Sequence, residues 1–320
     1  MGARETALNA LIACRMEQGW SNAVLKKYIR RDRLDARDAA LATRLCYGVV
    51  QNRGKLDFYL AQLLKGSLKK IHPAVRDILH LGLYQIYELD KIPDSAAVNE
   101  SVRLARKYGP AGCDKLVNGV LRNAVRTRGT LKEPTSYEDK YSHPAELVAL
   151  LKTALPKGTL ESVLKADNEA PDTVIQVNTL KTDMGSLVKR LEAEGVQSRP
   201  HCWMENCLVL SGTGSLEQLP SFREGFYYVQ DPASRLSVLC AGLKPGMAVL
   251  DCCAAPGGKS FAAAMAMGGQ GSITSCDVHA HKIPLIESGA ARLGISSLKA
   301  QLQDASVFVP NWEEQFDAVI

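Results

Sequence analysis

The sequence predicts a multidomain protein that combines an all-α part, a small α+β part and an incomplete α/β part of the Rossmann-like type. Three observations predict this fold class. Apolar residues recur at helical spacing up to about residue 128, helix and strand patterns then mix, and beyond residue 247 each predicted strand ends beside an acidic residue. The 320 residues also exceed the roughly 100 to 200 of one domain. We expect domains over residues 1–129, 143–235 and 236–320, and a linker over 130–142.

The first 128 residues predict a helix bundle. Val75, Ile78, Leu79, Leu83 and Ile86 have the spacing of one helix face. Glycine and proline residues mark the expected breaks between helices, and Ser95 could cap the helix that follows one of them. About four to seven helices fit between the breaks, which we place at Gly54, 66–73, 92–95 and 108–110.

Charge is distributed unevenly along the chain. Residues 1–128 contain 23 Lys and Arg against 12 Asp and Glu, whereas the remaining residues contain 16 against 22. This excess of positive charge predicts that the first part contacts a polyanion such as RNA. The basic residues crowd two segments as candidate phosphate contacts: Lys26, Lys27, Arg30, Arg31, Arg33 and Arg37, then Arg103, Arg106, Lys107, Arg122, Arg126 and Arg128.

The middle of the chain predicts a small α+β domain behind a linker. Residues 129–141 are polar and lack helical periodicity, which is typical of a connecting segment. Helical and alternating patterns then follow one another. We expect helices over 145–155 and 184–194, and strands over 173–178, near 207–210 and over 226–230.

The segment AVLDCCAAPGGKSFAAAMA, residues 248–266, predicts a strand, a tight loop and a helix. The strand ends at Asp251, and the helix follows Gly257 and Gly258. Because glycine has no side chain, the backbone can approach a ligand closely there, and the start of a helix presents unpaired N–H groups to an anionic group. The pattern therefore predicts a nucleotide-type ligand site.

Two further strands predict that this ligand contains adenosine. The strand over 272–277 ends at Asp277, which lies 20 residues after Gly257, the spacing at which a carboxylate accepts hydrogen bonds from ribose hydroxyls. The strand over 298–303 is followed by Asp304, which is placed to accept a hydrogen bond from an adenine amino group. A glycine-rich loop together with two such acids indicates an adenosine site more specifically than a glycine motif alone.

Two other nucleotide-binding folds fit this segment less well. Gly258, Lys259 and Ser260 match the end of the P-loop pattern, but that pattern requires glycine at position 253, which is Cys253, and Pro256 would stiffen the loop. A dinucleotide dehydrogenase is disfavoured because the loop lacks GxGxxG. An ATP site and a dinucleotide site are therefore the minor alternatives.

The cysteines and the apolar runs indicate a reduced, cytoplasmic protein. Nine cysteines form an odd set without a CxxC pair, which argues against a disulfide framework and against the common zinc sites. His201, Cys202 and Cys207 fit no common metal spacing, so we expect no metal. No apolar run approaches the roughly 18 residues that span a bilayer, so we expect no membrane contact.

The first part resembles the NusB-type RNA-binding helical domain. The resemblance is carried by LDARDAALATRLCYGVVQNRGKLD, residues 34–57, and by KLVNGVLRNAVR, residues 115–126. It implies a helical fold over most of residues 1–128 and RNA as the polyanion.

The rest of the chain resembles the Sun family of RNA cytosine methyltransferases. IQVNTLK (175–181), VQDPAS (229–234) and CAAPGGK (253–259) look like three family motifs in the family order. The chain departs from the family at two positions: Gln176 stands where an arginine is usual, and Glu146 where a tryptophan is usual. The first departure puts one RNA contact in doubt, and the second puts packing or stacking in doubt.

The arrangement of the three parts is similar to that of RsmB-like members, which methylate C5 of cytosine in 16S rRNA with S-adenosylmethionine. The resemblance implies 16S rRNA as partner and a monomer for the full-length protein. It implies that Asp277 binds the ribose and Asp304 lies near the adenine, while Cys253 belongs to the cofactor loop and is not the nucleophile. The implied cofactor ligands are Cys253, Ala254, Ala255, Pro256, Gly257, Gly258, Lys259, Asp277 and Asp304.

The family mechanism implies that a cysteine thiolate adds to C6 of cytosine, after which C5 accepts the methyl group and a base removes the C5 proton. The two family cysteines lie in Asp-Ala-Pro-Cys and Thr-Cys motifs, which we expect beyond Ile320, so no catalytic residue is assigned. We expect a fragment whose sheet has the order 3-2-1-4 and an open edge. The alternative is a non-catalytic RNA-binding protein that retains the cofactor site.

Overall fold

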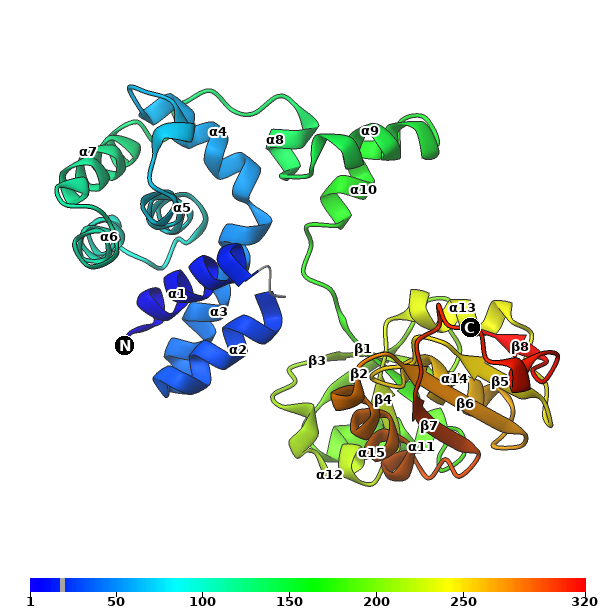
Figure 1. Cartoon of the computed structure of the whole chain (residues 1–320). Coiled ribbons are helices and arrows are strands. Elements are labelled where there is room, and N and C mark those ends of the chain that lie inside the picture. Colours follow the sequence, from blue (N-terminus) through cyan, green and yellow to red (C-terminus); the bar gives the residue numbers. More distant parts are fainter. Residues whose placement is uncertain (18–20) are drawn as a thin grey trace. The chain divides into compact units, whose positions relative to one another are not determined.

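The computed structural model describes residues 1–17 and 21–320. Contacts between residues divide the chain into a helical unit, Met1–Glu169, and a two-sheet unit, Ala170–Ile320, and the two are described separately below (Figure 1). Among the described residues, none of the helices is both long enough and apolar enough to cross a membrane.

The helical unit begins with a bundle built around α5 (Pro73–Glu88), which is buried along most of its length. This central helix contacts α1, α3, α4, α6 and α7, and Figure 1 shows it end-on among its neighbours. A helix that is apolar on nearly all sides belongs inside a bundle, so the predicted all-α fold is confirmed. The other elements are α1 (Ala3–Glu17), α2 (Ser21–Asp32), α3 (Ala36–Gln51), α4 (Arg53–Leu63), η1 (Leu68–Lys70), α6 (Asp94–Tyr108) and α7 (Cys113–Arg126).

Two predicted helix boundaries are wrong. Gly54 lies inside α4, and the preceding break falls at Asn52, whose side chain donates a hydrogen bond to the Gly48 carbonyl. A Cβ at Gly54 would lie 3.1 Å from the Cα of Ser142, so this glycine permits close packing and does not end a helix. Ser95 is not a cap either, since α6 already begins at Asp94.

Two more glycines allow tight packing within the bundle core. A Cβ at Gly48 would lie 2.0 Å from the ring of Tyr84, and one at Gly82 would lie 2.5 Å from the side chain of Leu121. Both contacts are impossible for a larger residue without movement of the neighbour. These glycines therefore fix α3 and α7 against α5.

Three shorter helices follow the bundle: α8 (Tyr137–Tyr141), α9 (Ala145–Ala154) and α10 (Leu160–Ala166). The first lies where we expected an irregular linker; Ser136 caps it by accepting a hydrogen bond from the Asp139 N–H at 3.1 Å, and it packs against α4. Val148, Leu160 and Leu164 form a small core of their own. Helices α9 and α10, which we expected in the second domain, group by contact with the helical unit.

The first sheet of the two-sheet unit is antiparallel and has the order β2-β3-β1-β4. Its predicted strands are confirmed, whereas β2 was missed because the sequence QSRP is polar and exposed and shows no alternation. The elements are β1 (Thr173–Val177), α11 (Met184–Ala193), β2 (Gln197–Pro200), β3 (Cys207–Ser211), η2 (Leu216–Gln218), α12 (Pro220–Arg223) and β4 (Tyr227–Val229).

The second sheet is parallel and has the order β7-β6-β5-β8. In sequence order this is the predicted 3-2-1-4 arrangement, and it brings the carboxyl ends of β5, β6 and β7 to one edge. The elements are α13 (Pro232–Cys240), β5 (Ala248–Asp251), α14 (Gly258–Ala266), β6 (Ser272–Asp277), η3 (Ala280–Lys282), α15 (Ile283–Leu293), β7 (Leu298–Leu302), η4 (Pro310–Trp312) and β8 (Ala318–Val319).

Buried polar side chains connect the two sheets. The Asn178 side chain donates 2.8 Å hydrogen bonds to the carbonyls of Gly225 and Leu293, which belong to the first and second halves of the unit. Gln176 is fully buried and accepts a hydrogen bond from Arg235. Position 176 therefore serves packing inside the unit, and the side chain does not reach the surface to contact RNA.

Candidate cofactor-binding site

A pocket of about 380 Å³ lies at the carboxyl ends of β5, β6 and β7. Parallel strands that end at one edge of a sheet commonly form such a ligand crevice. It is lined by the loop after β5, the turn after β6 and the turn after β7. The lining residues are Cys252, Cys253, Ala255, Asp277, Val278, His279, Lys282, Gln303, Asp304 and Ala305.

Asp251 anchors the loop after β5 through hydrogen bonds to its buried carboxylate. Its carboxylate is fully buried and accepts hydrogen bonds from the Ser260 hydroxyl at 2.7 Å and from the Cys253 N–H at 3.3 Å. Burial raises the pKa of Asp251, and the Ser260 hydrogen bond, the Lys259 charge and backbone N–H groups oppose this rise only in part. The residue thus fixes the loop and the start of α14 and does not line the pocket.

The loop turns sharply before α14 begins. Gly257 has φ of +115°, in the left-handed region, and a Cβ there would lie 2.3 Å from the ring of Phe261. The peptide bond between Ala255 and Pro256 is cis. The N–H of Ala254 donates to the Cys276 carbonyl of β6 at 2.8 Å, which ties the loop to the neighbouring strand.

Asp277 is the more buried of the two carboxylates that line the pocket. Both the N–H and the ring Nδ1 of His279 contact its Oδ1, at 3.0 and 3.1 Å, and the Lys282 ammonium lies 3.9 Å from the same atom. Burial by itself would raise the pKa of Asp277, but the His279 hydrogen bonds and the Lys282 charge outweigh it, so the pKa lies below its ordinary value. The group is ionised at neutral pH and can accept hydrogen bonds from a ligand.

Asp304 is exposed at the rim of the pocket. Its Oδ1 accepts hydrogen bonds from the hydroxyl and the N–H of Ser306, at 2.7 and 2.9 Å. These hydrogen bonds lower the pKa of Asp304, so it too carries a negative charge at neutral pH. The pocket therefore has one buried and one exposed carboxylate.

The structure brings together four of the nine residues predicted to bind the cofactor. Ala254 is buried, and the Lys259 ammonium lies 3.9 Å from the Asp251 carboxylate. Pro256 and Gly258 line a different pocket of about 760 Å³ beside Phe261, and Gly257 shapes the turn. The four that line the same pocket are Cys253, Ala255, Asp277 and Asp304.

Six of the ten residues that line the pocket were not predicted from the sequence, among them Val278, His279 and Lys282. His279 and Lys282 stabilise the charge of Asp277, and Val278 offers an exposed apolar surface beside it. Their proximity to a strand-ending acid was the available signal, because the turn after such a strand lines the same crevice. Within residues 1–17 and 21–320, no three His, Cys, Asp or Glu side chains are grouped as they would be for a metal ion.

Comparison with known families matches three segments of the chain. Residues 1–126 match the NusB family. Residues 143–217 match the ferredoxin-like domain of RsmF/B-like methyltransferases, and residues 239–320 match the 16S rRNA methyltransferase RsmB/F family. The matches follow one another along the chain, as the three predicted parts do.

Curated relatives match the chain along nearly its whole length. The probable ribosomal RNA small subunit methyltransferase B of Bacillus subtilis is 35% identical over 99% of this chain and 72% of its own. The probable ribosomal RNA small subunit methyltransferase B of Synechocystis is 32% identical over 93% of this chain and 68% of its own.

Two solved structures are similar to this chain in fold. The crystal structure of PH0851 covers 98% of this chain and 73% of its own with a TM-score of 0.75, at 22% identity, and thus shares the fold. A methyltransferase homolog protein from Pyrococcus horikoshii covers 58% of this chain and 62% of its own with a TM-score of 0.52, at 27% identity. The sequence relatives show that the chain belongs to the ribosomal RNA small subunit methyltransferase B family.

Proposed function

We propose that this protein transfers the methyl group of S-adenosylmethionine to C5 of a cytosine in 16S rRNA. The observation that carries the proposal is the pocket that gathers Asp277 and Asp304 beside the loop after β5. An acid at the end of the second strand is the usual partner of ribose hydroxyls in folds of this type. Family membership supports methyl transfer to small-subunit rRNA.

The side chains around the pocket suit the adenosine half of the cofactor. We assign the ribose hydroxyls to Asp277, the adenine amino group to Asp304 and the apolar face of the adenine to Val278. We assign the methionine half of the cofactor to the backbone at Cys253 and Ala255, which also line the pocket. The set combines ionised acceptors with an apolar wall, as small-molecule sites usually do.

When bound, S-adenosylmethionine would supply an electrophilic methyl group on its sulfonium. The residues of the pocket would hold the cofactor and fix its orientation, which raises the rate because the reacting atoms meet in one geometry. We assign no catalytic nucleophile within residues 1–320. We interpret Cys253 as part of the cofactor loop, in agreement with its place in the lining of the pocket.

We propose 16S rRNA in the cytoplasm as the substrate and the helical unit as its docking platform. The match of residues 1–126 to the NusB family and the positive charge of the first 128 residues support this role. We retain domains over residues 1–129, 143–235 and 236–320 and a monomeric full-length protein as parts of the proposal.

Nucleoside analysis after methyl transfer tests the proposal. Protein expressed from the complete coding sequence is incubated with 16S rRNA and S-adenosylmethionine that carries a labelled methyl group, and the RNA is digested to nucleosides. We expect the label in 5-methylcytidine. Label in a different methylated nucleoside, or no transfer by a protein that binds the cofactor, would contradict the proposed reaction.

A further inference from the structure

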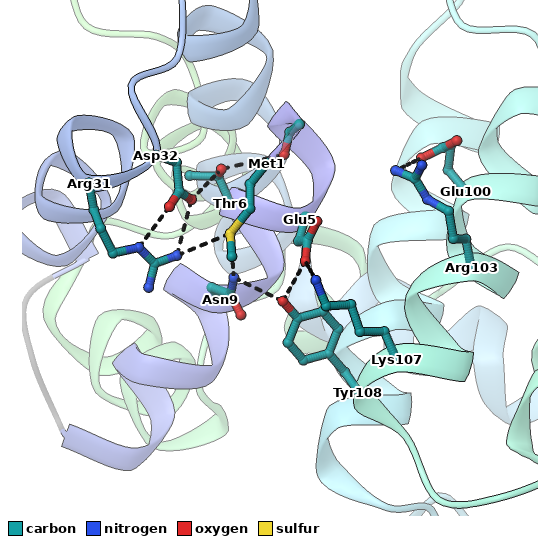
Figure 2. A network of polar contacts seen from close by, with 11 residues as sticks. Met1, Glu5, Thr6, Asn9, Arg31, Asp32, Glu100, Arg103, Lys107 and Tyr108 are labelled. Atoms are coloured by element: carbon teal, nitrogen blue, oxygen red, sulfur yellow. Dashed lines mark hydrogen bonds and ion pairs between the residues drawn. The ribbon is translucent and has the colours of Figure 1, made fainter.

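The structure divides the predicted phosphate contacts into two classes. Five of the twelve basic residues in the two predicted clusters form ion pairs inside the helical unit. Figure 2 shows three of these pairs, in which Arg31 contacts Asp32, Arg103 contacts Glu100 and Lys107 contacts Glu5. The remaining two are Arg106 with Asp114 and Arg128 with Asp94. A cation that already forms an ion pair contributes less electrostatic attraction to a phosphate.

Helix α7 carries a stripe of cations of the other class. Lys115, Arg122 and Arg126 are exposed and follow one another along one face of the helix. Arg122 and Arg126 donate hydrogen bonds to the Asn118 and Asn123 side chains, which are neutral. Among the described residues none of the three cations has an ion-pair partner, so their charge is available to an external anion.

Gly119 lies on the same face, between Lys115 and Arg122. A Cβ at Gly119 would meet no atom within 4 Å, so packing within the chain does not require a glycine there. Glycine in the middle of a helix is less favourable than alanine. A close approach of a ligand to the backbone of α7 would explain why this exposed position carries no side chain.

Two adjacent pockets open beside the stripe. One, of about 430 Å³, is lined by Lys65, Lys115 and Arg126 around apolar side chains. The other, of about 440 Å³, is lined mainly by apolar side chains, and its lining also includes Lys70 and His72. The two pockets share Leu64, Lys65 and Leu116. Cations therefore border two apolar hollows along one surface.

We propose that this α7 surface, formed by Lys65, Lys70, Lys115, Gly119, Arg122 and Arg126, binds a single-stranded RNA segment with unstacked bases in the two pockets. The cations would contact consecutive phosphates, and the sugar-phosphate backbone would pass over Gly119. Single-stranded RNA fits because its bases can turn outward into apolar hollows, which the bases of a duplex cannot do. The proposal rests on the proposed function only in taking this segment to be part of the rRNA substrate.

Helix α2 is the competing site within the helical unit. Lys26, Lys27 and Arg30 are also exposed and form no ion pair among the described residues. The α7 surface is favoured because it adds the two pockets and the exposed helical glycine. Binding measurements on variants of the two helices distinguish the two sites directly.

Fluorescence anisotropy with a short labelled single-stranded RNA of mixed sequence tests the α7 surface on the intact chain. We expect the double variant Lys115→Ala/Arg126→Ala to weaken binding roughly 10- to 100-fold at low salt. The slope of log Kd against log salt should fall by about 1.4, since each phosphate contact of a single strand contributes about 0.7. A duplex of the same sequence should bind more weakly than the single strand.

Arg31→Ala/Arg103→Ala is the matched control, because it removes the same charge from two ion-paired positions of the same unit. We expect this control to change Kd less than about 3-fold.

Gly119→Ala provides a second test, because it should have opposite effects on stability and on RNA binding. It should raise the Tm by a few degrees, about the effect of one favourable helix substitution, while weakening RNA binding several-fold.

Three outcomes would overturn the proposal. One is equal weakening by the α7 pair and by the control pair, which would show a general charge effect. Another is weakening by Lys26→Ala/Lys27→Ala but not by the α7 pair, which would move the site to α2. The third is an α7 surface that binds an acidic peptide but no RNA. Because the variants lie outside the cofactor pocket, S-adenosylmethionine binding measured in parallel shows separately whether the proposed function itself fails.

Discussion

We expect Asp277→Ala to lower the affinity for S-adenosylmethionine at least about 100-fold. The ionised carboxylate would accept hydrogen bonds from two ribose hydroxyls, and a hydrogen bond to a charged group contributes about 1.5–3 kcal/mol. Loss of both therefore costs roughly 3 kcal/mol or more, and each 1.4 kcal/mol corresponds to about a tenfold change in Kd. Isothermal titration of the intact chain measures the change.

Two other variants make this result specific. Glu287→Ala removes an exposed carboxylate of α15 in the same two-sheet unit and should leave the affinity unchanged. Asp304→Ala should weaken binding by about tenfold, because it would remove one hydrogen bond at an exposed rim. If Asp277→Ala bound S-adenosylmethionine as tightly as Glu287→Ala, the assigned role of Asp277 would be wrong.

The second large effect concerns the core of the helical unit. We expect Asp57→Ala to lower its free energy of unfolding by about 2–4 kcal/mol. Asp57 in α4 contacts Arg76 and accepts from the His80 Nε2 at 2.8 Å, and His80 is 1% exposed. Removal of the carboxylate would leave a buried ring nitrogen and a guanidinium without their acceptor. Thermal unfolding should show a Tm lower by roughly 5–15 °C.

The pH dependence of the same variant has a definite sign. Burial by itself would raise the pKa of Asp57, but hydrogen bonds and charges from His80 and Arg76 outweigh it, so the pKa lies below its ordinary value. A carboxyl group with a lowered pKa stabilises the fold above its ordinary pKa of about 4 and loses that contribution as pH falls. The difference between wild type and Asp57→Ala should therefore be constant at neutral pH and shrink below about pH 4.

Asp90→Ala is the control for the helical unit, because Asp90 is exposed and follows α5. Its Tm should stay within a degree or two of the wild type. Equal stability of Asp57→Ala and Asp90→Ala would show that the Asp57 cluster does not support the fold.

The parts of the fold that depend on local pattern could be predicted from the sequence. The strand β6 has the predicted bounds, Ser272–Asp277, and ends at the predicted acid. The loop after β5 and the order of the parallel sheet followed from the glycines and from the family resemblance. The strand and the loop are encoded within short segments, so they are visible without a structure, whereas the sheet order was known only from the family resemblance.

Features that depend on contacts between distant segments could not be predicted. Gly54 looked like a helix break, but its role is to let Ser142 approach α4. Gln176 looked like an altered RNA contact, but it is buried against Arg235. The sequence also could not show which basic residues are neutralised, since the partner of Lys107 is Glu5, about a hundred residues earlier.

The most direct test of the account is calorimetric titration of the intact chain with S-adenosylmethionine and, separately, with Mg-ATP. The pocket offers two carboxylates to an adenosine and lacks the glycine at position 253 that a phosphate-binding P-loop requires. We predict saturable binding of S-adenosylmethionine and no binding of Mg-ATP. Tight binding of Mg-ATP without binding of S-adenosylmethionine would contradict the assignment of this pocket to a methyl donor.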